Sequence, residues 1–399
     1  MTDDAVLVVG AGPVGVLNAL GLARAGVPVT VLDRAPGVNW SPRAAIYHWA
    51  ALDGLDRLGV FDQAAARGFL KQDYEYRAYR TGERVRFGLD SLDGLVDRPY
   101  NLHLGQGALV QLALDELAGY GTARVLWEHS VVGLVQDDTG VTVTAQTPAG
   151  TETFRAAWAI GADGASSAVR KALGLPFEGF TWPERFVATN IHYPFAEHGF
   201  TQSTFIVDDV HGAVIAKLDD TGGTGLWRYT YCESQDLPEE GVLDRMPRFH
   251  EAVLPTPDEV EVAEWAPYRM HQRVAPRFRE GRVLLAGDAA HVTNPSGGLG
   301  LTGGLFDTFV LQEALAAVVH GTADESVLDA YSRERRRVFV EMVDPAATAI
   351  KRMIFHSADP EQLERDMAGL RRLASDRDAL VERLMATKRM ETPSLVAAR

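Results

Sequence analysis

The chain has 399 residues, of which 46% are hydrophobic and 23% charged, and its formal net charge is −15. This length fits two domains or one large α/β unit, and the acidic balance argues against nucleic acid or an anionic membrane as a partner. The single cysteine, Cys232, excludes an internal disulfide, and the histidines show no Cys/His spacing that would indicate a metal site.

The beginning of the chain is acidic (MTDD) where a signal peptide would be basic. No apolar run reaches the roughly 18 residues that a membrane span needs. We therefore expect a cytoplasmic protein without a membrane span.

The first predicted elements form a strand, turn, helix and strand. They are expected at residues 5–9, 13–25 and 27–32. Gly10 suits the tight turn, Gly12 the approach of a pyrophosphate, and Gly15 the packing of the helix on the sheet. Asp33 follows the middle glycine by 21 positions (33 − 12), where a carboxylate can hold ribose hydroxyls. The unit predicts a bound dinucleotide.

The middle of the chain is rich in predicted strands. Residues 74–89 alternate around a Thr-Gly-Glu turn and predict a hairpin, and residues 101–117 carry leucines at helical spacing. Residues 124–153 indicate three antiparallel strands, and residues 158–164 a buried strand that ends in Asp-Gly. From residue 176 to 276 the aromatic-rich alternation is typical of a mixed sheet.

The most unusual stretch is residues 281–304, GRVLLAGDAAHVTNPSGGLGLTGG. An apolar strand ends at Gly287 and Asp288, so a carboxylate that can accept hydrogen bonds from hydroxyl groups stands where a ligand can come close. Five glycines follow, and an apolar helix begins among them. The amides and positive dipole end of that helix favour an anionic, flat ligand.

Helices are expected from residue 305 onward. The basic run 332–337 is interpreted as a solvated face or an ion-pair seam. Residues 358–399 predict an amphipathic helix pair that could pack on the first domain or on a second subunit.

Three of these stretches, residues 6–34, 159–170 and 281–304, resemble in content and order the motifs of the FAD-dependent aromatic hydroxylases, the family of p-hydroxybenzoate hydroxylase. The resemblance extends over nearly the whole chain. It implies an α/β fold with a Rossmann-like FAD-binding domain, an inserted mixed β-sheet substrate-binding domain, and C-terminal helices. The corresponding ranges are 1–178 with 277–350, then 179–276, and 351–399.

The resemblance implies FAD as the cofactor, since the family places the aspartate matching Asp288 on the ribityl chain, which NAD lacks. No second GxGxxG follows in the sequence, so NADH or NADPH would dock transiently as a co-substrate. The implied cofactor-binding residues are Gly10, Gly12, Gly15, Asp33, Arg34, Arg43, Gln106, Asp163, Gly164, Arg170, Gly287, Asp288, Pro295, Gly298, Gly300, Leu301 and Thr302.

Some of these positions carry alternatives or departures from the family. Asp163 could instead, or also, cap the helix that follows it, and Arg34 could face solvent. Thr302 stands where many relatives have Asn, so only its backbone contact carries over from the family. Gly298 stands where some relatives carry a longer side chain.

The implied reaction is monooxygenation. NADH or NADPH reduces FAD, the reduced flavin adds O2 at C4a, and the hydroperoxide delivers oxygen to a phenolic or hydroxylated heteroaromatic ring. Candidate catalytic residues are Tyr47, His48, His192 and Tyr229, each also compatible with packing at a domain seam or on a sheet face. The expected partners are a small aromatic substrate and O2, and the chain is expected to be a monomer or homodimer.

Two alternatives remain open from the sequence. One is an FAD-dependent reductase or dehydrogenase of the same fold that inserts no oxygen. The other is a non-catalytic flavin-binding redox sensor.

Overall fold

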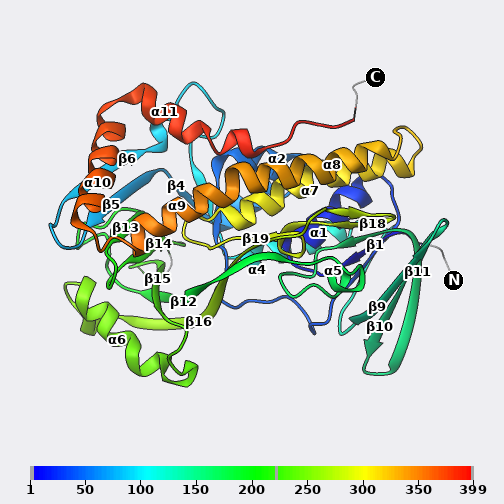
Figure 1. Ribbon diagram of the computed structural model, residues 1–399, viewed down its shortest axis with the longest axis horizontal. Helices are drawn as coiled ribbons and strands as arrows, with labels where there is room; N and C mark the ends of the chain where they lie inside the picture. Colours follow the sequence, from blue (N-terminus) through cyan, green and yellow to red (C-terminus); the bar gives the residue numbers. More distant parts are fainter. Residues whose placement is uncertain (1–3, 221–222, 397–399) are drawn as a thin grey trace.

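The computed structural model describes residues 4–220 and 223–396, which form two large sheets, one small sheet and the helices around them (Figure 1). The first large sheet is built around β1, which pairs in parallel with β2 and β11. The apolar residues of its central strands β1, β2 and β18 are buried on both faces, or nearly so, as strands covered on both sides require. The strands are β1 (Asp4–Val9), β2 (Val29–Leu32), β8 (Ala123–Leu126), β9 (Ser130–Asp137), β10 (Gly140–Thr147), β11 (Gly150–Gly161), β17 (Arg279–Glu280) and β18 (Val283–Leu285).

The prediction of three antiparallel strands over residues 124–153 is wrong for the first of them. β8 pairs in parallel with β2, whereas β9, β10 and β11 form an antiparallel meander that projects as a wing at the right of Figure 1. Parallel pairing of β8 is possible because helix α4 (Gln106–Leu117) precedes it and carries the chain back across the sheet.

Helix α7 (Leu299–Val319) is the core helix of this part of the molecule. It packs on α1 (Pro13–Arg24), and α1 packs on α4. By length and composition α7 could cross a membrane, but 78% of its apolar window is buried inside the molecule. Its hydrophobicity is therefore accounted for by packing.

The second large sheet has the order β19-β16-β12-β15-β14-β13-β5-β6. The predicted hairpin at residues 74–89 is present as β5 and β6, and it joins this sheet through parallel pairing of β5 with β13. Helix α6 (Val242–Val253) covers one face. The strands are β5 (Asp73–Ala78), β6 (Arg84–Gly88), β12 (Glu178–His192), β13 (Ser203–Val207), β14 (Ala213–Lys217), β15 (Leu226–Ser234), β16 (Glu261–Val274) and β19 (His291–Val292).

The opposite face of this sheet, here called the inner face, is partly covered by helices α9 (Asp344–Phe355) and α10 (Pro360–Ser375). Cys232 lies on this face, directly opposite Phe186 of β12. Its thiol is partly buried, and burial raises its pKa above the ordinary value.

The small sheet consists of β3 (Ile46–Tyr47), β7 (Asn101–His103) and β4 (Phe69–Lys71), in that order. Because side chains alternate along a strand, its registers define one face that we call the polar face. The polar face comprises Ile46, Phe69, Lys71, Asn101 and His103. Tyr47 and Leu102 lie on the other face, in the largest hydrophobic core cluster of the described residues.

The remaining helices surround these sheets, and the predicted C-terminal helix pair is present as α10 and α11. α8 and α9 run on through a π-helical turn at Phe339–Val343 and form one long rod across Figure 1. The helices are α2 (Trp49–Arg57), α3 (Phe61–Arg67), α5 (Ala168–Ala172), α8 (Ser326–Val338), α9 (Asp344–Phe355), α10 (Pro360–Ser375) and α11 (Arg377–Met385). Short 3-10 turns lie at Leu89–Leu92, Glu239–Gly241, Pro257–Glu259, Gly287–Ala289 and Lys388–Met390.

A buried ion pair joins α7 to α8. Arg335 Nε donates to Asp307 Oδ1 at 2.8 Å, and Asp307 Oδ2 accepts from His291 Nε2 at 2.7 Å and from the amide of Gly287 at 2.9 Å. Arg335 also donates to the carbonyl of Met390 at 2.7 Å, which fixes the C-terminal segment. Burial alone would raise the pKa of Asp307, but His291 and Arg335 together hold it at about 2.

The basic run 332–337 therefore has two roles. Arg337 pairs with Glu334 and Glu341 at the surface, as the ion-pair interpretation predicts. Arg335 is 1% exposed, and the solvated-face interpretation is wrong for it. Helical periodicity places these two arginines on different faces of α8.

We expect Arg335→Ala to destabilise the protein by about 3 to 5 kcal/mol, because it leaves the Asp307 carboxylate buried without its cation. The matched change Arg337→Ala, on the same helix, should cost no more than about 1 kcal/mol. Because folding lowers the pKa of Asp307 to about 2, its contribution is present above about pH 4 and is lost as the pH falls through 2. Urea unfolding of both variants measures the difference, and equal midpoints would contradict the assignment.

Candidate functional site

The first glycine motif encloses free space at the start of α1. A Cβ on Gly10, whose φ is +106°, would lie 2.4 Å from the carbonyl oxygen of Ala162, and one on Gly15 would lie 1.9 Å from that of Gly10. A Cβ on Gly12, by contrast, would meet no atom of the described residues within 4 Å. Gly10 and Gly15 thus permit close packing, and Gly12 leaves room for a ligand.

Asp33 lies next to this space and holds the backbone around it. Its carboxylate accepts hydrogen bonds from the amides of Ala11 at 2.6 Å and Ala35 at 2.7 Å. The neighbouring Arg34 side chain is exposed, which agrees with the solvent-facing alternative. The carboxylate of Asp33 therefore stands beside the Gly12 opening.

The third motif presents a carboxylate and a helix start to the same region. Gly287, with φ +57°, lets the chain turn after β18, and the carboxylate of Asp288 reaches solvent although protein surrounds it. This surrounding burial raises the pKa of Asp288, a tendency that nearby His291 and Arg43 oppose. A solvent-accessible carboxylate at the end of a buried strand suits the hydroxyl groups of a ligand.

Helix α7 begins directly after Gly298, whose φ is +66°. The first amides of a helix, here those of Leu299, Gly300 and Leu301, have no partner within the helix and attract negative charge, whereas the Thr302 amide begins the helical hydrogen bonds. The Thr302 hydroxyl donates to the carbonyl of Gly298 at 3.3 Å and is buried, so it is bonded within its own helix. Pro295, at the start of the turn, is exposed.

The second motif connects the other two. Asp163 caps α5 by accepting from the amide of Ala168 at 2.6 Å, and Gly164 follows with φ +79°. Arg170 donates to the carbonyl of Ala289 at 2.8 Å and to that of Ala165 at 2.7 Å. Its guanidinium therefore joins the second motif to the third.

These residues fit FAD. The opening at Gly12 suits the pyrophosphate, Asp288 suits the ribityl hydroxyls, and the start of α7 suits the anionic end of the ring. Arg43 is exposed on the turn beside the site, and Gln106 is the half-buried first residue of α4, with its amide bonded to the carbonyl of Ala44 at 3.2 Å.

His48 lies against the turn that precedes α7. Its Nε2 is 3.0 Å from the carbonyl oxygen of Gly297 and must donate, because a carbonyl only accepts. Burial lowers the pKa of His48 to about 4, with a further lowering by Lys71 and an opposing effect of the Gly297 bond. His48 is therefore a neutral imidazole with an unprotonated Nδ1 at neutral pH.

The inner face of the second sheet approaches from the other side. Arg228 Nε donates to Asn190 Oδ1 at 2.7 Å, and its NH1 donates to the carbonyl of Arg43 at 2.6 Å. Tyr268 lies on the same face, and burial raises its pKa to about 12 although Arg228 opposes the shift. The sequence did not mark Tyr268 as a candidate site residue. No motif or spacing in it distinguished Arg228 from the other polar residues on predicted strands.

The other candidate catalytic residues are held elsewhere. Tyr229 donates to the carbonyl of Phe249 at 3.0 Å, on the face of the sheet that α6 covers. His192 Nδ1 donates to the carbonyl of Gly225 at 3.0 Å. Tyr47 is fully buried on the face of the small sheet opposite the polar face. Of these four candidates, His48 contacts the turn that precedes α7.

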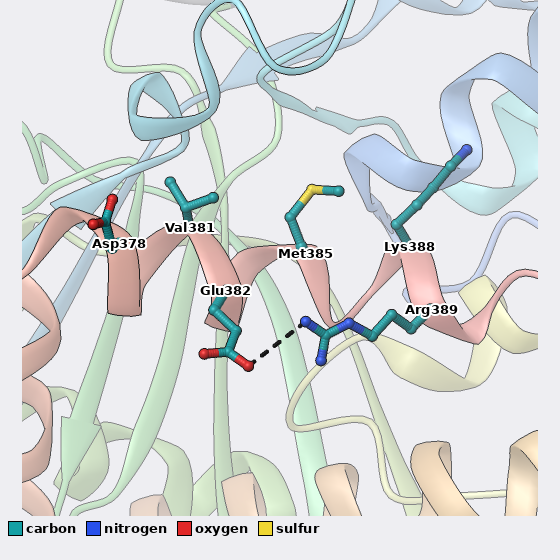
Figure 2. A pocket seen from close by; sticks show the side chains of 6 residues that line it. All are labelled: Asp378, Val381, Glu382, Met385, Lys388 and Arg389. Carbon is teal, nitrogen blue, oxygen red and sulfur yellow. Dashed lines mark ion pairs between the residues drawn. The ribbon is translucent and has the colours of Figure 1, made fainter.

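Two open depressions lie outside this region. One, of about 420 Å³, is on α11, where Figure 2 shows Val381 and Met385 beside the ion pair of Glu382 and Arg389. The other, of about 480 Å³, lies between α4 and β8. Neither is lined by a residue of the three motifs, so neither is the candidate site.

Comparisons with known proteins agree with this geometry. A family model described as FAD binding domain matches residues 3–346. The chain is 42% identical over 388 residues to 6-hydroxy-3-succinoylpyridine 3-monooxygenase HspB of Pseudomonas putida, covering 97% of this chain and 98% of that protein. It is also 42% identical over 393 residues to para-nitrophenol 4-monooxygenase of Pseudomonas sp. strain WBC-3, covering 98% and 96%.

A solved structure has the same overall fold. The crystal structure of p-nitrophenol 4-monooxygenase PnpA from Pseudomonas putida DLL-E4 matches with a TM-score of 0.93 and 41% identity, covering 98% of this chain and 99% of that one.

We expect Gly12→Ala to fold normally but to weaken FAD binding by at least about tenfold, or about 1.4 kcal/mol, because its Cβ enters the opening left for the pyrophosphate. Gly369→Ala on α10 is the matched control, since its Cβ also meets no described atom within 4 Å. Titration of the apoproteins with FAD measures both affinities. Equal affinities for the two variants would place the cofactor elsewhere.

Proposed function

Because the chain belongs to the FAD-dependent aromatic hydroxylases, we propose that it oxygenates a small hydroxylated aromatic ring with O2 and with NADH or NADPH. The family, the α/β fold class and FAD-dependent aromatic hydroxylation, all predicted from the three motifs, are confirmed by these matches. The observation that carries the proposal is that Gly287 and Gly304 of the third motif pack on Val14 of the first, with His48 bonded to the turn before α7.

The names of two relatives support a narrower substrate class. Both describe a six-membered aromatic ring with a hydroxyl group opposite a second substituent, and both number the oxygenated carbon as the one that bears this substituent. A hydroxyl oxygen donates electron density to the carbon opposite it, and more strongly after losing its proton. The proposed substrate is accordingly a phenol or hydroxypyridine substituted para to its hydroxyl.

The protein's own contribution is to bind, orient and shield. FAD, when bound, supplies the exchange of electrons with the nicotinamide and with O2. The first amides of α7 stabilise negative charge at the ring end, and Asp288 orients the ribityl chain. The inner face and the polar face exclude water from the substrate. NADH or NADPH docks transiently near Asp163 and Arg170.

The proposed domain division follows the motifs. Residues 1–178 and 277–350 bind FAD, residues 179–276 hold the substrate, and residues 351–399 brace the assembly, while β5 and β6 extend the substrate sheet. We place the protein in the cytoplasm as a monomer or homodimer.

The test follows NAD(P)H and O2 consumption by the purified holoenzyme with 4-nitrophenol, 6-hydroxy-3-succinoylpyridine and a set of hydroxybenzoates. We expect at least one ring compound to accelerate NAD(P)H oxidation and to be oxygenated only when O2 is present. Product formation without O2 would instead indicate a reductase or dehydrogenase. Bound FAD whose reduction no ring compound accelerates would indicate a redox sensor.

We expect His48→Ala to lower kcat by about 10-fold or more, because loss of a buried hydrogen bond to the Gly297 carbonyl releases the turn before α7. His48→Gln, which retains a donor, should recover part of the loss, and FAD content should stay unchanged in both. Tyr229→Phe, whose hydroxyl bonds on the α6 side, is the control with unchanged kcat. Full activity of His48→Ala would remove His48 from the site.

A further inference from the structure

Two fully buried polar atoms on the polar face have no hydrogen-bond partner among the described residues. They are Nζ of Lys71 and Nε2 of His103, and both side chains are 0% exposed. A buried polar group without a partner costs free energy, so such atoms are rare and need an explanation. Two of them on one face, next to a ligand site, indicate a place where a ligand supplies the missing bonds.

The polar face spans the gap between the cofactor side and the substrate sheet. On one side, His48 directly follows β3 and bonds to Gly297 in the turn before α7. On the other side, His103 Nδ1 lies 2.6 Å from the carbonyl oxygen of Lys217 at the end of β14. Lys71 is on β4, the strand that pairs with β7 on the side away from β3, so it lies beside the second anchor.

Tyr74 links the polar face to the second sheet. Asn101 Nδ2 donates to its hydroxyl oxygen at 2.7 Å, and Lys71 Nζ lies over its ring. Tyr74 is on β5, an outer strand of the substrate sheet. The free end of Lys71 is therefore surrounded by the elements that enclose the substrate.

The protonation states of the two side chains follow from these contacts. The Lys217 carbonyl only accepts, so His103 Nδ1 carries the hydrogen and Nε2 is an acceptor. Burial and then Lys71 lower the pKa of His103 to about 3. Burial also lowers the pKa of Lys71 well below its ordinary value, although Asp73 opposes the shift.

We propose that Lys71 binds the hydroxyl oxygen of the substrate ring and accepts its proton. The O–H bond breaks, its electron pair stays on the oxygen, and the proton bonds to Nζ, so a neutral amine and a neutral phenol become an ammonium and a phenolate. The ammonium then donates to the phenolate oxygen, and the Nε2 of His103, unpaired among the described residues, lies on the neighbouring strand. This assignment deepens the proposed function and rests on it for the hydroxylated ring.

The surroundings favour this transfer. The titratable groups that face Lys71 are His48 and His103 from the first domain and Asp73 and Tyr74 from β5. With both histidines neutral, a proton on Nζ meets no other cation among these four groups. A charge-assisted hydrogen bond between ammonium and phenolate is roughly twice as strong as a neutral one. The phenolate in turn enriches the carbon opposite it in electron density.

Static binding of 4-nitrophenol to the oxidised holoenzyme tests the proposal without NAD(P)H. The phenol is colourless and its phenolate is yellow, so difference spectra report the ionisation state of the bound compound. At a pH below the pKa of free 4-nitrophenol, wild type should bind it as the phenolate. Lys71→Met should bind it at least about tenfold more weakly and as the phenol.

Lys388→Met is the matched control, because its Nζ pairs with Glu391 outside the polar face and the change should leave both affinity and colour unchanged. Lys71→Met removes an unpartnered amine and should retain the wild-type FAD content and melting temperature; Lys71→Gln serves as the second variant if it does not fold. The proposal is overturned if the wild-type enzyme fails to bind 4-nitrophenol or binds it only as the phenol. It is also overturned if the Lys71 variants bind the phenolate as well as the wild type does. Phenolate binding by wild type without any NAD(P)H oxidation would instead overturn the proposed function alone.

Discussion

The buried carboxylate of Asp307 is the constraint on which the cofactor side depends. One side chain holds the amide of Gly287 at the end of β18, His291 in β19 and Arg335 in α8. Because a buried charge without these partners would be strongly unfavourable, the three elements are fixed relative to α7. The turn that presents Asp288 and the helix start that presents free amides therefore keep one relative position, which is what a preorganised electrostatic site requires.

The substrate side follows a different principle. It has two neutral imidazoles and an amine whose pKa burial lowers, all removed from water. A cluster of neutral bases is less costly to bury than a cluster of cations, and it can still receive one proton. In the site as proposed, a fixed positive helix dipole serves the cofactor and a buried nitrogen base serves the substrate.

The cofactor-binding part of the site could be predicted from local sequence patterns. The roles of Gly10, Gly12 and Gly15 were predicted from their spacing together with the flanking strands and Asp33, although the contact that requires glycine at position 10 is with the distant Ala162. The parallel pairing of β8 depends on a crossover through α4. The buried position of Arg335 depends on its ion pair with Asp307, 28 residues earlier in the chain. Neither feature follows from local periodicity. Lys71 and His103 are brought together by the pairing of strands that are distant in sequence. A strand of three residues is too short for the alternation of side chains to reveal a polar face.

The lone thiol of Cys232 has a consequence for durability. Enzymes that activate O2 lose part of it as hydrogen peroxide, which attacks the thiolate form of cysteine. Burial against Phe186 keeps this sulfur protonated, because its pKa is raised above the ordinary value. The single cysteine is therefore held in its less nucleophilic thiol form.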